Sequence, residues 1–101
     1  MGPVTIHHLA LQADWDSARQ AGEYRVSTRG CSLDDAGFIH CSRDLAQLRG
    51  VHSAFYTDVT EPLLVLDIDP AGLDVRVEDG FPHVYGPLPV SAVTAVHPFT
   101  P

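Results

Sequence analysis

The sequence predicts an α+β fold: one compact domain with a mostly antiparallel, split β-sheet structure and two main helices. Its 101 residues are a usual length for one domain. Two stretches, near residues 13–21 and 44–55, have helical spacing of apolar residues, and most other apolar runs are strand-like. The second half is a succession of short strands and turns, which favours antiparallel pairing. No repeat or linker divides the chain, so residues 1–101 are expected to form a single domain.

The first elements alternate between strands and a helix. Val4–Leu9 has the β-branched and apolar residues of a strand. Ala13–Ala21 is predicted to be a helix, with acidic residues in its first turn and Gly22 at its C-terminal end. Glu23–Val26 then reads as a short strand. The polar stretch Ser27–Ala36 is predicted to be a loop with a single helical turn at its SLDD sequence.

A short apolar strand, Phe38–Cys41, leads into the second helix, Asp44–Phe55. Ser42 is the predicted N-cap of this helix, because a serine hydroxyl can accept a hydrogen bond from a free backbone N–H of the first turn. The apolar face of the helix is marked by Leu45, Leu48, Val51, His52 and Phe55.

The rest of the chain is predicted to be strands separated by turns. The strands are expected at Pro62–Ile68, Leu73–Val77, Phe81–Leu88 and Val93–Phe99. Pro62–Ile68 has the continuous apolar character of a buried strand. Asp69–Gly72 and Glu78–Gly80 have turn composition. Prolines and a glycine interrupt Phe81–Leu88, which is typical of an edge or a strand end.

Composition limits the classes of function. A formal charge of -7 and a pI near 5.0 argue against broad DNA or RNA binding. The chain has no lysine, which excludes Schiff-base chemistry on lysine. Cys31 and Cys41 lack the spacing of a redox or zinc motif. The N-terminal residues do not resemble a signal peptide, and no apolar run has membrane-spanning length, so a cytoplasmic protein without membrane association is expected.

Three histidines interrupt otherwise apolar strand-like segments: His8, His40 and His83. A buried imidazole needs a hydrogen-bond partner or a cavity, because an unpaired buried polar group costs about 1–3 kcal/mol. We expect the three to meet in one cleft, where imidazole is suited to acid–base catalysis near neutral pH. His7 and His8 must lie on opposite faces of their strand, and the sequence does not decide which of them faces the cleft.

Other residues of the same segments could bind a ligand. Arg25, in the predicted strand after Tyr24, could pair with a phosphate or carboxylate, or be a solvated surface residue. The aromatic candidates for stacking on a planar ligand are Phe38, Phe81 and Tyr85, although core packing explains such residues equally well. Ser42 could contact a ligand or only cap the helix. Cys41 is expected in the core, and Glu78 is interpreted as an ordinary turn residue.

These motifs resemble a family of small bacterial proteins of uncharacterised function, DUF952. The matching segments are IHHL (6–9), ADW (13–15), GEYR (22–25), GFIHCS (37–42), LVL (64–66), DP (69–70) and FPHVYGPL (81–88). They occur in the family's order along nearly the whole chain. One departure is Val77, where family members tend to carry tryptophan.

A looser resemblance links this family to the ADP-ribosyltransferase fold, which includes the RNA 2′-phosphotransferases. It implies that His8 holds a ribose hydroxyl, that His40 takes a middle-strand site position, and that His83 lies nearest the reaction. The late-strand residue of those enzymes is often a glutamate, which is replaced here by His83. NAD is the substrate that this resemblance implies.

The leading hypothesis is therefore a transferase-like enzyme with a histidine-lined cleft for NAD, ADP-ribose or a related nucleotide or phosphate. His8, His40 and His83 would be catalytic, with Arg25, Phe38, Ser42, Phe81 and Tyr85 contacting the ligand. A non-catalytic nucleotide- or anion-binding protein is one alternative. A metal-dependent hydrolase with three histidine ligands is another, although no metal is expected because the histidines lack paired ligand spacing. A partner in another polypeptide is compatible with any of these.

Overall fold

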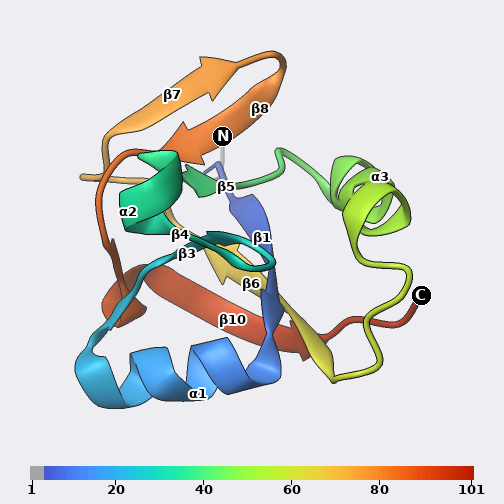
Figure 1. The fold of residues 1–101 in the computed structure, drawn as a ribbon. Helices are drawn as coiled ribbons and strands as arrows, with labels where there is room; N and C mark the ends of the chain where they lie inside the picture. Colours follow the sequence, from blue (N-terminus) through green and yellow to red (C-terminus); the bar gives the residue numbers. More distant parts are fainter. Residues whose placement is uncertain (1–3) are drawn as a thin grey trace.

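Three antiparallel strands form the largest sheet in the computed structural model, which describes residues 4–101 (Figure 1). They are β1 (Ile6–Leu11), β6 (Leu63–Ile68) and β10 (Val93–Pro98), in the order β1-β6-β10. The apolar run that predicted a buried strand is the central one, and Leu66 and Ile68 are completely buried. The register places His7 opposite Asp67 and His8 opposite Leu66.

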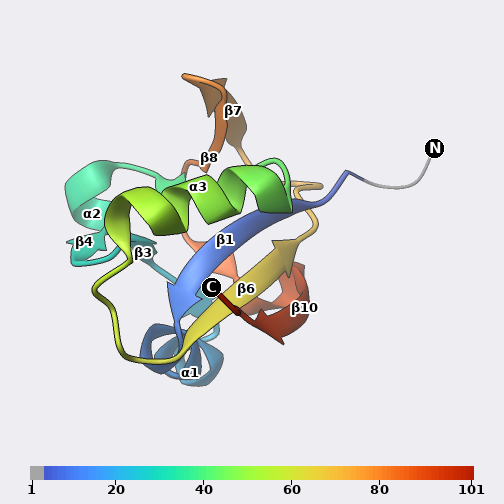
Figure 2. The ribbon, with the colours of Figure 1, turned by 90° about the vertical axis from the view of Figure 1, so that its right-hand side faces the viewer.

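A second antiparallel sheet contains two of the three predicted site histidines. Its strands are β5 (Ile39–His40), β8 (Phe81–Val84) and β7 (Val75–Glu78), in the order β5-β8-β7. The hairpin of β7 and β8 projects from the domain and turns at Asp79 and Gly80, which both have positive φ (52° and 81°) (Figures 1 and 2). An Asp-Gly pair suits such a two-residue turn. Glu78 therefore remains in β7, and the prediction of a turn over residues 78–80 is wrong by one residue.

Ser42 joins the two sheets. Its backbone N–H donates to the carbonyl of His7 (2.7 Å), and the N–H of His7 donates to the carbonyl of Ser42 (2.8 Å). The segment that follows β5 thus pairs with β1. The two predicted histidine segments are held together by backbone hydrogen bonds, whatever their side chains do.

The predicted loop over residues 27–36 is only partly correct. Here β3 (Val26–Thr28) and β4 (Cys31–Ser32) form a small hairpin, and the expected single turn is the short helix α2 (Leu33–Ala36). The remaining ladder pairs β2 (Glu23–Tyr24) with β9 (Leu88–Pro89), followed by a 3₁₀ turn, η1 (Val90–Ala92). Arg25 lies between β2 and β3 and belongs to neither strand, contrary to the prediction.

The two long helices, α1 (Gln12–Ala21) and α3 (Leu45–Phe55), are confirmed within about a residue of their predicted bounds. Gly22 ends α1 in the left-handed conformation (φ 88°). Ser42 does not cap α3. Asp44 does, because its carboxylate accepts from the N–H of Gln47 (2.7 Å), while Gln47 Oε1 accepts from the N–H of Arg43 (2.8 Å).

The helices cover opposite faces of the largest sheet. Alternate residues of a strand point to opposite faces. One face packs on α1, and its buried cluster includes Ile6, Ala10, Trp15, Ala18, Leu66 and Ile68. The other packs on α3 through Leu9, Leu48, Val51, Leu63 and Val65. Among residues 4–101, no helix is long and apolar enough to cross a membrane.

The observed cap of α3 gives a first prediction. Asp44→Ala should lower the free energy of unfolding by about 1 kcal/mol, because the N–H of Gln47 loses its acceptor. Urea denaturation measures the loss. Gln20→Ala, an exposed change within α1, is the control and should be nearly neutral. Equal effects in the two variants would contradict a capping role for Asp44.

Candidate functional site

One face of the β5-β8-β7 sheet carries most of the predicted site residues. Alternation along a strand points every second side chain to the same side. The face formed in this way contains Phe38 and His40 from the β5 segment and Phe81, His83 and Tyr85 from the β8 segment. Five of the eight residues predicted from the sequence are therefore neighbours.

The two histidines of this face are in direct contact. His40 and His83 are paired across the strands, and His40 Nδ1 lies 3.2 Å from His83 Nε2. Phe38 stacks on the His83 ring, with centroids 3.9 Å apart and planes inclined by 12°. Phe81 lies against His40, with centroids 4.7 Å apart. The aromatic neighbours leave His83 only 8% exposed, whereas His40 is partly exposed.

Glu78 completes the cluster, although its sequence context predicted an ordinary turn residue. Its Oε1 accepts hydrogen bonds from His83 Nδ1 (2.8 Å) and from the Tyr85 hydroxyl (2.5 Å). The hydrogen bonds from Tyr85 and His83 hold the pKa of Glu78 below its usual range, so the side chain is a carboxylate at neutral pH. The sequence did contain a signal for this position. The Asp-Gly pair that follows Glu78 can form the turn by itself, which keeps Glu78 in the strand and places it near His83.

When both rings are neutral, the hydrogen-bond chain fixes their tautomers. The carboxylate of Glu78 can only accept, so His83 donates from Nδ1, and Nε2 of the neutral His83 ring is an acceptor. His40 must then donate from Nδ1, which leaves Nε2 of its neutral ring with a lone pair. Burial and the neighbouring His83 lower the pKa of His40, which favours this neutral form.

The lone pair of His40 Nε2 is accessible. Within residues 4–101, no hydrogen bond joins this nitrogen to another protein group, and no buried side-chain nitrogen or oxygen lacks a partner. The ring of His40 is partly exposed, so Nε2 is available to a ligand. Glu78, His83 and His40 form a relay that ends in a partly exposed imidazole base, which resembles the carboxylate–histidine arrangement that orients catalytic histidines.

His8 lies behind this relay, and its predicted contact with a ribose does not fit the structure. Its Nδ1 donates to the carbonyl of His40 (2.6 Å), and its Nε2 accepts from the Tyr24 hydroxyl (2.9 Å). Burial lowers the pKa of His8 to about 4, so the ring is neutral. Both nitrogens are engaged within the protein. His8 therefore positions the backbone of β5, and His7 lies on the opposite face of β1.

The cavity between His8 and His40 is too small for an organic ligand. A cavity lined by His8, Ser27, His40, Ser42 and Tyr56 has a volume of only about 10 Å³. That is room for about one water molecule, whereas pockets for organic ligands usually measure about 300–1,000 Å³. Ser42 is buried beside this cavity. A ligand of the relay would lie on the open sheet face instead.

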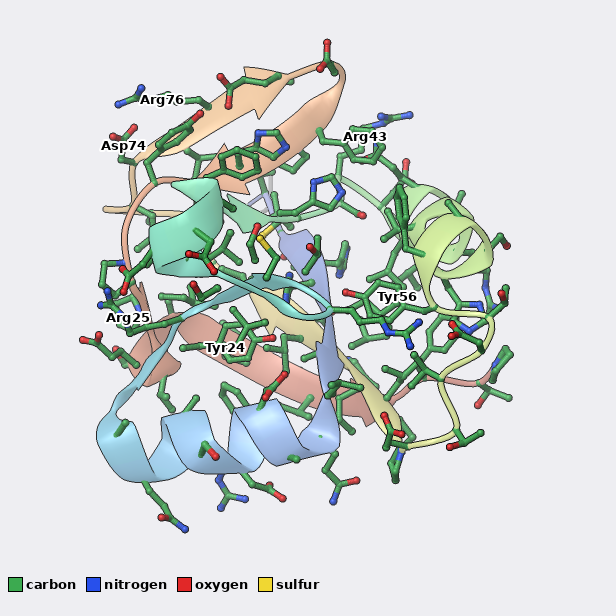
Figure 3. The ribbon with its side chains drawn as sticks, viewed as in Figure 1. Tyr24, Arg25, Arg43, Tyr56, Asp74 and Arg76 are labelled. Atoms are coloured by element: carbon green, nitrogen blue, oxygen red, sulfur yellow. The ribbon has the colours of Figure 1, made fainter. Side chains whose placement is uncertain are left out.

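Arg25 does not reach this face. Its guanidinium is exposed and pairs with Glu23 and Asp34, both at 2.8 Å. Figure 3 shows it well apart from Arg76 and Asp74, which lie beside the β7–β8 hairpin.

Two other arginines border the hairpin. The guanidinium of Arg76 lies 4.1 Å from the centroid of the Tyr85 ring and pairs with Asp74. Arg43 donates to the carbonyl of Gly80 (3.0 Å). These two, rather than Arg25, are the cations available to an anionic ligand on the face.

Neither the metal site nor a cysteine nucleophile gains support. In the described part of the chain, no three His, Cys, Asp or Glu side chains are disposed to hold a metal ion. His8 has no ring nitrogen left to offer. Burial raises the pKa of Cys41 to about 12, so this thiol is an unreactive part of the core, as predicted.

Comparisons with known proteins agree with the motifs. Residues 9–96 match the family described as "Protein of unknown function (DUF952)". The chain belongs to the DUF952 family. The crystal structure of protein CC0527 from Caulobacter crescentus is 30% identical, with a TM-score of 0.76, and the match covers 95% of this chain and 86% of that one. The solution structure of CC0527 is 31% identical over 92% and 82% of the two chains, with a TM-score of 0.69.

These comparisons show the family and the fold. A search among curated proteins finds no match. The more distant likeness of this DUF952 protein to the ADP-ribosyltransferases remains a prediction.

Proposed function

We propose that this protein is a transferase-like enzyme in which His40 is the general base. The chain of hydrogen bonds from Glu78 through His83 to His40 carries the proposal. It holds His40 in the tautomer that accepts a proton at Nε2, on the exposed side of the ring. Positioned general bases contribute about 10²- to 10⁴-fold to rates.

The proposed ligand is NAD, ADP-ribose or a related nucleotide, bound across the open face. Phe38 and Phe81 offer aromatic surface, and Arg76 and Arg43 border the hairpin as phosphate partners. In ADP-ribosyl transfer, the acceptor hydroxyl would lose its proton to His40 Nε2 as its oxygen bonds to the ribose carbon. The bond to nicotinamide would break, with its electron pair leaving on the nicotinamide nitrogen.

Glu78 supports this proposal because it supplies a carboxylate that the sequence motif lacks. The sequence motif offers histidine where the compared transferases often have glutamate. The fold supplies a carboxylate from the neighbouring strand, 2.8 Å from that histidine. The negative charge is thus present, but it acts through His83 and not directly on a ligand.

A thermal-shift screen with NAD, ADP-ribose, nicotinamide mononucleotide and phosphate tests the proposal, with and without a chelator. A ligand at about a hundredfold excess over Kd should add about 2.7 kcal/mol of stability. Nicotinamide release is then measured if NAD or nicotinamide mononucleotide binds. His40→Gln should bind this ligand but lose turnover, whereas His52→Gln, on α3, should retain both.

The results separate the alternatives. Binding without turnover would favour the non-catalytic nucleotide- or anion-binding protein. Stability lost only on chelation would favour a metal-dependent protein. Full turnover in His40→Gln would overturn the assignment of His40 as the base.

A further inference from the structure

A larger pocket lies on the other side of β1 and has no part in the proposed relay. Its volume is about 280 Å³, and it lies between α3 and the β1-β6-β10 sheet. The residues that line it come from all four elements and from the chain that follows β10. Figure 1 shows α3 and the end of the chain on the same side of the sheet.

The polar part of the pocket is a second histidine–carboxylate cluster. Asp67 Oδ1 accepts from His7 Nδ1 and Asp67 Oδ2 accepts from His97 Nε2, both at 2.7 Å. Burial alone would raise the pKa of Asp67, but these hydrogen bonds from His97 and His7 lower it overall, so Asp67 is a carboxylate. Each of its oxygens already has a donor, and its charge is directed at the two imidazoles.

Arg49 is the guanidinium of this pocket. Its Nη1 donates to the carbonyl of Thr100 (3.1 Å), and its central carbon lies 5.4 Å from the centroid of the Phe99 ring. No carboxylate pairs with Arg49 among residues 4–101, unlike Arg25, Arg29 and Arg76. A guanidinium has five N–H donors, so donors remain for an acceptor in the pocket.

The remaining walls are apolar. They are formed by Leu45, Leu48, Val65, Pro98 and Phe99. Leu45 is 53% exposed, so part of this apolar surface is in contact with water. A ligand with an apolar body would cover it, and such burial is favourable in proportion to area.

We propose that this pocket binds a small organic carboxylate with an apolar body. The carboxylate would pair with the guanidinium of Arg49, since Arg–carboxylate pairs are charge-assisted and often bidentate. The apolar body would lie between α3 and the sheet, against Leu48 and Val65. Arg49 would repel a cationic head group, and the negative charge of Asp67 is already shared with two imidazole donors.

The experiment uses three probes with the same body: 3-phenylpropionate, 3-phenylpropanol and 3-phenylpropylamine. Isothermal titration calorimetry should show saturable binding of the carboxylate, weaker binding of the alcohol and none of the amine. Arg49→Gln should weaken carboxylate binding about tenfold or more, because the charge-assisted pair is lost. Arg19→Gln, an exposed change on α1, is the matched control and should have no effect.

His40→Gln should bind the carboxylate as the unmodified protein does, so failure of the relay proposal and failure of this one can be told apart. Perturbed NMR signals of Leu48 and His97 on titration would place the probe. Equal binding of the three probes, no saturable binding of the carboxylate, or an unchanged affinity in Arg49→Gln would overturn the proposal.

Discussion

Replacing Glu78 with glutamine is expected to reverse the tautomers of both relay histidines and to reduce turnover about 10²- to 10⁴-fold. In the present structure the carboxylate accepts from His83 Nδ1. A glutamine amide can donate to that nitrogen instead, which moves the proton of His83 to Nε2. His83 Nε2–H would then face His40 Nδ1, 3.2 Å away, and His40 would have to carry its own proton on Nε2. The base of the site would be blocked.

Nitrogen-15 NMR of the imidazoles measures this directly, before any substrate is known. At a pH at which both rings are neutral, the unmodified protein should show Nδ1-protonated rings for His40 and His83, and Glu78→Gln should show the Nε2-protonated forms. Asp74→Asn is the matched control, because Asp74 precedes the same strand but pairs with Arg76. Its histidine spectra should be unchanged.

Kinetics give an independent check once a substrate is found. Groups that act as one unit have non-additive effects. Glu78→Gln combined with His40→Gln should therefore be no slower than His40→Gln alone. If the loss of turnover in the double variant equalled the product of the two single losses, no relay would exist. Unchanged tautomers in Glu78→Gln would lead to the same conclusion.

Acidification is expected to remove about 3 kcal/mol of folding stability through His8 alone. The pKa of His8 is about 4 in the folded protein and 6.5 without the protein environment. Between these values the unfolded chain binds a proton that the folded chain does not, so stability falls as the pH falls. The contribution is fully present above about pH 6.5 and is lost by about pH 4.

Urea denaturation at a series of pH values across this window measures the loss. His8→Gln is the control, because an amide cannot take up a proton there. The variant should be less stable at neutral pH, since the Tyr24 hydroxyl or the His40 carbonyl loses its partner. Its stability should nevertheless vary less with pH than that of the unmodified protein. Parallel pH profiles would mean that His8 does not titrate in this range.

The sequence predicted a cleft with His8, His40 and His83, and only His40 and His83 lie on the relay face. Five residues of this face could be selected from the sequence because strand alternation is a local property. Phe38 and His40 are two residues apart, as are Phe81, His83 and Tyr85, so two short strands with the right register suffice to bring them together. Glu78 was missed because three turn-like residues were assigned to the turn, although Asp79 and Gly80 alone complete it.

Other differences depend on contacts between distant segments. His8 interrupts an apolar strand-like segment just as His40 does. Its exposure, however, is decided by Tyr24, which covers it from another strand. Ser42 and Asp44 are equally good caps by residue type. Ser42 instead pairs its backbone with His7, which leaves Asp44 to begin the helix. No local pattern contains that information.

The adjacent histidines of β1 have a consequence for how this strand can vary. His7 contributes to the Asp67 cluster and His8 to the support of β5, from opposite faces of one strand. A shift by a single residue would exchange the faces of the whole strand. Because both neighbours are imidazoles, such a shift would still put a histidine on each side, but it would also move Leu9 and Ala10 to the wrong cores. The apolar residues, not the histidines, therefore determine the register of β1. A leucine at position 10 would make Leu9 and residue 10 alike and would specify the register less strongly.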